Sequence, residues 1–144
     1  MKPAGGTELL YKNFEKYVDR TKTDNINLIV SLCYRELLSD SKVNVLWQHL
    51  MTDQYNVINM SDNQFVNGVD HYVYVSNWQL EQFKQKFDVD HCNNHVIKNA
   101  IEPIDYIQKP KDKIRLIYTS MPNRGLEVLL DAFDMMKRDD VELI

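Results

Sequence analysis

The sequence is poor in the residues that define several protein classes. It has two cysteines, Cys33 and Cys92, too few for the disulfide framework of a small secreted domain, so a reduced cytoplasmic setting is expected. No apolar run approaches the roughly 18–20 residues that span a bilayer. Residues 1–6 lack the hydrophobic stretch of a signal peptide, and none is expected. The four glycines form neither a Gly-x-Gly-x-x-Gly dinucleotide fingerprint nor a Gly-Lys-Ser/Thr phosphate loop.

An excess of positive charge is also lacking, with 17 lysines and arginines against 21 acidic residues. The 144 residues carry a formal net charge of −4, which argues against a nucleic-acid-binding protein, because such proteins present a basic face. The balance does not exclude anionic ligands, since the N-terminus of a helix can bind phosphate on an acidic protein. The apolar fraction of 44% and the charged fraction of 26% are ordinary for a globular chain that buries a core.

Short β-branched or aromatic runs alternate with amphipathic stretches along the chain. This alternation predicts an α/β fold of the Rossmann-like kind, with a parallel sheet and helices on both faces. Strands are expected at 26–32, 43–47, 72–75 and 95–98, and helices at 7–18, 62–69 and 77–87. In such sheets, ligands bind at the carboxyl ends of the strands, so the turns that follow strands are where functional residues are expected.

The chain is expected to comprise more than one domain. Residues 1–102 would form the first Rossmann-like domain, and 103–113, with two prolines and three lysines, a linker. Residues 114–144 would open a second domain with a strand at 114–119, a helix at 124–137 and a strand from 141. Both ends look cut, because no strand precedes the turn at Gly5-Gly6 and the last strand follows a single βα unit. We therefore expect more chain, or a partner such as a second copy, to complete the sheets.

Gly5, Gly6 and Thr7 stand at a predicted helix start. Glycine lets a ligand approach the backbone closely, and the free N–H groups of a helix N-terminus favour a phosphate or carboxylate. The alternative is a glycine turn with Thr7 as the N-cap.

A second helix start follows the strand at 114–119. Here Ser120 begins the turn, and Arg124 and Gly125 are expected in the first helical turn, where a cation opposes the helix dipole. An anion bound there would remove that penalty, because arginine and free N–H groups together can hold a diphosphate. The alternative is an exposed arginine beside an Asn123 cap.

Histidines offer two further candidates. His49 follows a predicted strand and could carry a proton or donate a hydrogen bond in a cleft, or it could be a half-buried structural histidine. His91, Cys92 and His95, with His71 nearby, suggest a zinc site only weakly, because a second ligand pair is missing. We expect an ordinary loop and no metal. The aromatic residues of 77–87 are expected in the core.

Five segments carry a resemblance to a known family, and they occur in its order: Gly5-Gly6-Thr7-Glu8, Trp47-Gln48-His49, Val75-Ser76-Asn77-Trp78-Gln79, Val96-Ile97-Lys98-Asn99-Ala100-Ile101, and Tyr118-Thr119-Ser120-Met121-Pro122-Asn123-Arg124-Gly125-Leu126-Glu127. The chain resembles glycosyltransferase family 4, the group 1 glycosyltransferases, over nearly its whole length. The resemblance implies a GT-B fold of two Rossmann-like domains. It also implies transfer of a sugar from a nucleotide diphosphate sugar, with retention of configuration and without a metal or other cofactor.

The resemblance also implies roles for particular residues. Gly5, Gly6 and Thr7 would approach the donor diphosphate, Ser120, Arg124 and Gly125 would hold it from the second domain, and His49 would lie near the transferred sugar as the catalytic residue. Many family members have an arginine in place of Ser120 and a lysine in place of Arg124. The acidic motif that binds the donor sugar and ribose would lie beyond Ile144.

The expected function is therefore that of a glycosyltransferase fragment. Its partners would be a nucleotide-sugar donor and a saccharide, lipid or protein acceptor, with peripheral membrane contact in the lipid case. One alternative is a non-catalytic module that binds an acceptor or a partner protein. A weaker alternative is another Rossmann-type nucleotide-binding enzyme.

Overall fold

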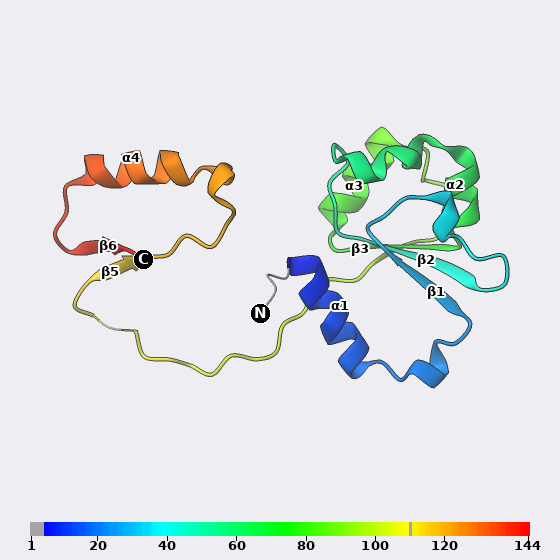
Figure 1. The fold of residues 1–144 in the computed structure, drawn as a ribbon, viewed down its shortest axis with the longest axis horizontal. Helices are drawn as coiled ribbons and strands as arrows, with labels where there is room; N and C mark the ends of the chain where they lie inside the picture. Colours follow the sequence, from blue (N-terminus) through cyan, green and yellow to red (C-terminus); the bar gives the residue numbers. More distant parts are fainter. Residues whose placement is uncertain (1–4, 110) are drawn as a thin grey trace. The chain divides into compact units, whose positions relative to one another are not determined.

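The computed structural model describes residues 5–109 and 111–144, with the backbone alone for Arg20. It confirms an α/β fold with a parallel sheet flanked by helices (Figure 1). The sheet runs in the order β1-β2-β3-β4, and each neighbouring pair is parallel. Its strands are β1 (Ile26–Val30), β2 (Val43–Gln48), β3 (His71–Tyr74) and β4 (Asn94–Val96).

One face of this sheet is sealed by α2 (Asn63–Gly68) and α3 (Asn77–Lys86). The side chains between them are almost fully buried, and the rings of Tyr74 and Phe83 pack with their centroids 5.2 Å apart. A fully buried side chain of this size contributes on the order of 1.5–3 kcal/mol to stability. The core on this side is formed mainly by Ile29, Leu46, Phe65, Tyr72, Tyr74 and Phe83.

The opposite face is covered by α1 (Gly6–Tyr17), and more loosely (Figure 1). Phe14 of this helix contacts Trp47 of β2, with 5.8 Å between the ring centroids. No residue of α1 is buried, and the strand residues beneath it are only half-buried, as at Val45 and Val73. Helices therefore lie on both faces, but α1 leaves space between itself and the sheet.

Element boundaries differ from the expected ones where a local backbone conformation intervenes. The first strand ends at Val30 instead of residue 32, because Ser31 has a left-handed φ of 63°. Four 3₁₀ helices in the described residues were not expected: Arg20–Lys22, Arg35–Leu37, Tyr55–Ser61 and Pro122–Arg124. The strand expected at 95–98 begins one residue earlier and ends at Val96.

The helix starts are set by caps. Ser76 caps α3, as its hydroxyl accepts a hydrogen bond from the backbone N–H of Gln79 at 3.1 Å. The possibility that Thr7 caps the first helix is wrong: Gly5 is the N-cap of α1, and Thr7 lies inside the helix.

Residues 102–144 form a second compact unit, separate from residues 1–101. Within it, α4 (Leu126–Met136) connects β5 (Ile114–Leu116) to the parallel strand β6 (Val141–Leu143). Val141 is the only buried residue in the described part of this unit. A unit of this size without a core is not expected to be stable alone.

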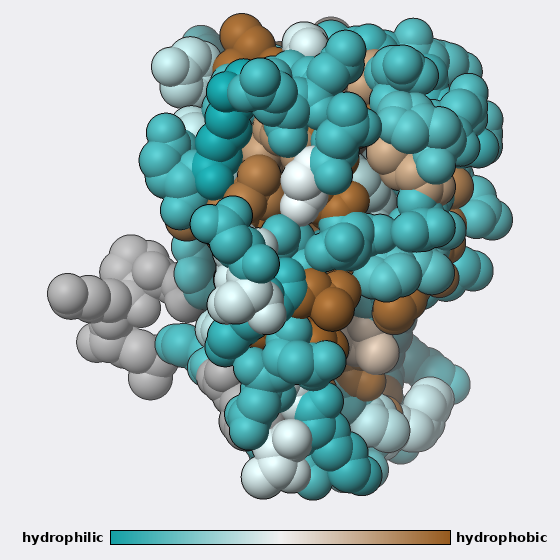
Figure 2. Space-filling view, turned by 90° about the vertical axis from the view of Figure 1, so that its right-hand side faces the viewer, coloured by the Kyte–Doolittle hydropathy of each residue, from teal (hydrophilic) through white to brown (hydrophobic). Residues whose placement is uncertain are grey.

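The face of the molecule drawn in Figure 2 is mostly hydrophilic. Figure 2 shows apolar side chains that reach the surface in small groups between hydrophilic ones. None of the helices in the described residues has the length and apolar character needed to cross a membrane.

Candidate functional site

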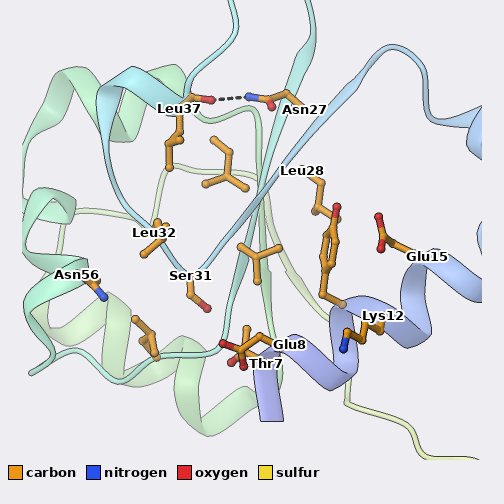
Figure 3. A pocket seen from close by; sticks show the side chains of 14 residues that line it. Thr7, Glu8, Lys12, Glu15, Asn27, Leu28, Ser31, Leu32, Leu37 and Asn56 are labelled. Atoms are coloured by element: carbon orange, nitrogen blue, oxygen red, sulfur yellow. Dashed lines mark hydrogen bonds between the residues drawn. The ribbon is translucent and has the colours of Figure 1, made fainter. Parts of the chain in front are cut away.

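A cavity of about 710 Å³ lies between α1 and the carboxyl end of β1 (Figure 3). The first half of α1 supplies Thr7, Glu8 and Lys12, and the end of β1 supplies Ser31. Leu50 and Asn56 border it from the segments that follow β2. The cavity therefore joins a helix N-terminus to the carboxyl edge of a parallel sheet, where ligands of such folds bind.

Ser31 is the most unusual residue of this cavity. Its side chain is 6% exposed, and its Oγ has no hydrogen-bond partner in the described part of the chain. Its φ of 63° is uncommon outside glycine and costs on the order of 1–2 kcal/mol. Strain and an unpartnered buried hydroxyl at one position favour a binding role. The sequence gives no signal for it beyond a polar residue at the end of an apolar run.

Glu8 modifies the anion site expected at the start of α1. A Cβ placed on Gly5 would lie 2.6 Å from a carboxylate oxygen of Glu8, so this carboxylate rests against the helix start (Figure 3). A carboxylate in the first turn is stabilised by the helix dipole. A phosphate at Gly5 and Gly6 would therefore compete with the Glu8 carboxylate, and its binding would require Glu8 to adopt another rotamer.

His49 follows β2 and packs edge-on against Trp47, with 4.5 Å between the ring centroids. Its Nε2 is buried without a hydrogen-bond partner in the described residues, and burial lowers the pKa of the imidazole. The neighbouring Leu50 lines the cavity. A neutral imidazole beside the carboxyl edge is a suitable proton acceptor or hydrogen-bond donor.

We expect His49 to make stability fall in mild acid. Because the folded-state pKa is lowered, the unfolded chain binds a proton as pH drops through about 6.5, while the folded chain does not. The free energy of unfolding of the wild type should therefore decrease more steeply between pH 7.5 and 5.5 than that of His49→Gln. The difference in slope can reach at most about 1.4 kcal/mol per pH unit. Urea titrations at several pH values measure it, and parallel profiles would contradict a buried neutral His49.

Cys33, whose backbone N–H bonds to the carbonyl oxygen of Asn56, is not a candidate nucleophile. It is fully buried, and burial raises the pKa of its thiol to about 12, despite a weak hydrogen bond from Gln48. A thiol of this kind stays protonated at neutral pH, and the thiolate is the reactive form.

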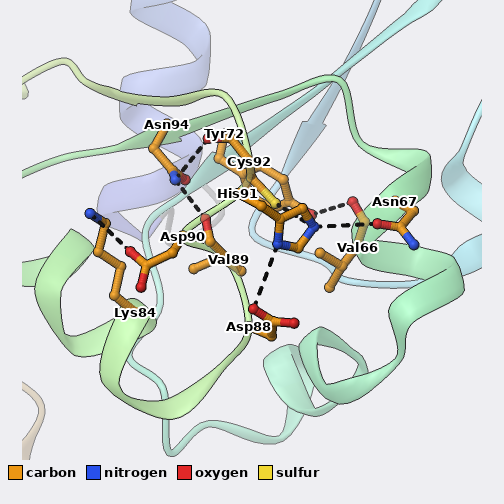
Figure 4. A network of polar contacts seen from close by, with 10 residues as sticks. All are labelled: Val66, Asn67, Tyr72, Lys84, Asp88, Val89, Asp90, His91, Cys92 and Asn94. Atoms are coloured by element: carbon orange, nitrogen blue, oxygen red, sulfur yellow. Dashed lines mark hydrogen bonds and ion pairs between the residues drawn. The ribbon is translucent and has the colours of Figure 1, made fainter.

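The loop that carries His91 and Cys92 is held by side-chain contacts (Figure 4). His91 Nδ1 lies 3.6 Å from Asp88, and its Nε2 lies 3.4 Å from the amide oxygen of Asn67. His95 instead contacts His71, with 3.1 Å between ring nitrogens. Across residues 5–109 and 111–144, no three histidine, cysteine or acidic side chains are grouped so as to hold a metal ion.

The predicted residues of the second unit lie in the turn after β5. Ser120, Arg124 and Gly125 are all exposed. The expectation that Arg124 stands in the first turn of the long helix is wrong, because Arg124 ends a 3₁₀ helix and Gly125, with φ of 100°, separates it from α4. Arg124 still directly precedes Gly125, the N-cap of α4.

The structure thus brings some of the predicted residues into one region. Thr7 lines the cavity, Gly5 and Gly6 precede it at the helix start, and Leu50 places the segment of His49 at its border. Arg124 belongs to the other compact unit, so its convergence with Gly6 on one diphosphate stays a prediction.

Comparison with known proteins adds no relative: the chain matches no protein-family model, no curated protein and no solved structure.

Proposed function

We propose that this chain is part of a cytoplasmic glycosyltransferase that transfers a sugar from a nucleotide diphosphate sugar with retention and without a metal. The main support is the cavity beside the N-terminus of α1, at the carboxyl edge of a parallel sheet, with the strained and unpartnered Ser31 in its wall. The order of the sequence segments that resemble glycosyltransferase family 4 supports the same proposal.

The proposed chemistry needs fixed hydrogen-bond donors and no metal. Cleavage of a glycosyl–phosphate bond builds negative charge on the leaving diphosphate, and donors aimed at that charge stabilise the transition state. The N–H groups at the start of α1 and the guanidinium of Arg124 would be such donors. His49 would lie near the transferred sugar, and the cavity at Ser31 would receive the acceptor.

Gly6→Ala tests the donor site with little disturbance of the fold. A Cβ built at Gly6 meets nothing within 4 Å, and alanine is a better helix former than glycine, so stability should be kept or rise. The added methyl group would stand where the diphosphate approaches the backbone. We expect calorimetry with UDP- and GDP-sugars to show donor binding by the wild type and at least a tenfold loss in Gly6→Ala.

Asn13→Ala is the matched control, because Asn13 is an uncharged, exposed residue of the same helix that does not line the cavity. It should change donor affinity less than Gly6→Ala. Absence of binding by the wild type, or equal affinity in wild type and Gly6→Ala, would refute the assigned donor site.

A non-catalytic binding module is the second candidate, and Glu8 favours it. Its carboxylate rests where the diphosphate would bind. If Glu8 blocks the donor, only Glu8→Gln should bind a nucleotide sugar, and the wild type should bind acceptor alone.

A further inference from the structure

A second cavity, of about 600 Å³, lies on the same side of the sheet beneath α1. Its wall is almost entirely apolar, with Phe14 from the helix and Val45, Trp47 and Val73 from the strands. Ile97, just beyond β4, is 59% exposed and lies at its edge. The volume falls within the range of small-molecule sites, which is roughly 300–1,000 Å³.

The two cavities adjoin. Tyr11 of α1 and Leu28 of β1 line both of them, so the two cavities are neighbours beneath the helix, and a molecule that occupies both must pass these two side chains. The first cavity holds the polar groups, with the unpartnered Oγ of Ser31 among them (Figure 3). The second contains a buried donor, Nε1 of Trp47, that has no hydrogen-bond partner among the described residues. Together they form one polar and one apolar compartment.

The charges of the polar compartment indicate what kind of head group fits. Its charged side chains include Glu8 and Lys12, whose opposite charges offset each other, and its uncharged polar side chains include Thr7, Ser31 and Asn56. These side chains offer no surplus of positive charge to an anionic head group. A neutral group rich in hydroxyls could bond with Ser31 and with Glu8, because carboxylates accept hydrogen bonds from hydroxyls.

We propose that the acceptor is amphipathic, with a neutral, hydroxylated head group in the cavity of Ser31 and a single apolar chain in the cavity of Trp47. The assignment of this molecule as an acceptor rests on the proposed function, whereas its binding does not. The chain replaces water against Phe14, Trp47 and Val73, and the head group presents a hydroxyl at the carboxyl edge of the sheet. Burial of each methylene should then tighten binding about fourfold.

The test uses n-alkyl β-glucosides with four to eight carbons, below their micelle concentrations, and the fluorescence of Trp47. The background is Trp78→Phe, because Trp78 is 61% exposed on α3 and would add an unrelated signal. Affinity should rise with each methylene, and the Trp47 emission should shift on binding. Ser31→Ala should weaken octyl glucoside about five- to tenfold, the effect of one lost hydrogen bond, and leave octanol unchanged.

Val73→Phe fills the apolar compartment, so the affinity for alkyl glucosides should no longer increase with the length of the alkyl chain. Because a larger core residue can disturb folding, Ile97→Phe at the exposed edge provides a second, milder block. Affinity that is independent of chain length, or unaffected by both variants, would overturn the proposal. So would tighter binding of octyl phosphate than of octyl glucoside.

These measurements contain no nucleotide sugar. If the wild type binds a nucleotide sugar but no amphiphile, only the proposal of an amphipathic acceptor is refuted. Amphiphile binding without donor binding removes the glycosyltransferase and leaves a binding module for the same ligand.

Discussion

Replacement of Asn44 by alanine is expected to lower the free energy of unfolding by about 3 kcal/mol or more. Asn44 stands at the start of β2 and is 5% exposed. Its Oδ1 accepts from Asn27 Nδ2 at 2.8 Å and from the backbone N–H of Ser39 at 2.8 Å. Its Nδ2 donates to the carbonyl oxygens of Ser39 at 3.0 Å and Gly68 at 2.9 Å.

The size of the effect follows from the groups left behind. Alanine removes the side-chain amide, while its partners on the flanking loops stay in place and lose their bonds. A buried polar group without a partner costs about 1–3 kcal/mol, and total stability is only about 5–15 kcal/mol. Denaturant titration measures the loss.

Asn77→Ala is the control for this prediction. Asn77 is an exposed residue at the start of α3, and its replacement should change stability by at most about 0.5 kcal/mol. Similar losses in the two variants would show that the hydrogen bonds of Asn44 do not hold the loops to the sheet.

Replacement of Arg124 by alanine is expected to weaken donor binding about 10- to 100-fold, the effect of losing a hydrogen bond to a charged group. The guanidinium is exposed and has no hydrogen bond or ion pair within the described residues, so the fold should not depend on it. Calorimetry with UDP and GDP at fixed ionic strength measures the loss. Sugar transfer, measured with excess acceptor, should fall by at least the same factor.

Two variants separate a specific contact from a general change of charge. Arg138→Ala alters the net charge equally, and the arginine it removes pairs with Asp140 in the same unit, so donor affinity should hardly change. Arg124→Lys should recover part of the affinity, because lysine keeps the charge but lacks the forked donors. Equal losses for Arg124→Ala and Arg138→Ala would remove the diphosphate role of Arg124.

The class of fold was predictable because its signals are local. The apolar runs at β1, β2 and β3 have the length and residue types of buried strands, and predicted helices separate β2 from β3 and β3 from β4. Parallel pairing follows, since a helix between two strands returns the chain in the same direction. The cap at Ser76 is also a local signal, as a hydroxyl before a helical pattern satisfies an N–H of the first turn.

The candidate site was predictable only in part. The helix start at Gly5 and Gly6 and the segment of His49, which lie beside the cavity, were predicted from turns at element boundaries. Ser31 was missed because its sequence context gives no sign of a left-handed φ or of an unpartnered hydroxyl. The start of α4 was also predicted too early, at Arg124. Gly125 adopts a left-handed φ that ends the preceding 3₁₀ helix, and the apolar pattern of α4 does not reveal this break.

The sequence by itself determined which segments form strands and helices, since that depends on residue type and on spacing within a single element. Only the tertiary structure decided that the α2/α3 face of the sheet is sealed while α1 leaves two adjoining cavities. It also decided that Asn44 joins the loop of Ser39 and the C-terminal end of α2 to the sheet, and that Ser31, with its left-handed backbone, lines a cavity. These features depend on groups far apart in the chain, whose approach is set by side-chain volumes and by the hydrogen bonds left to be made once the sheet has formed.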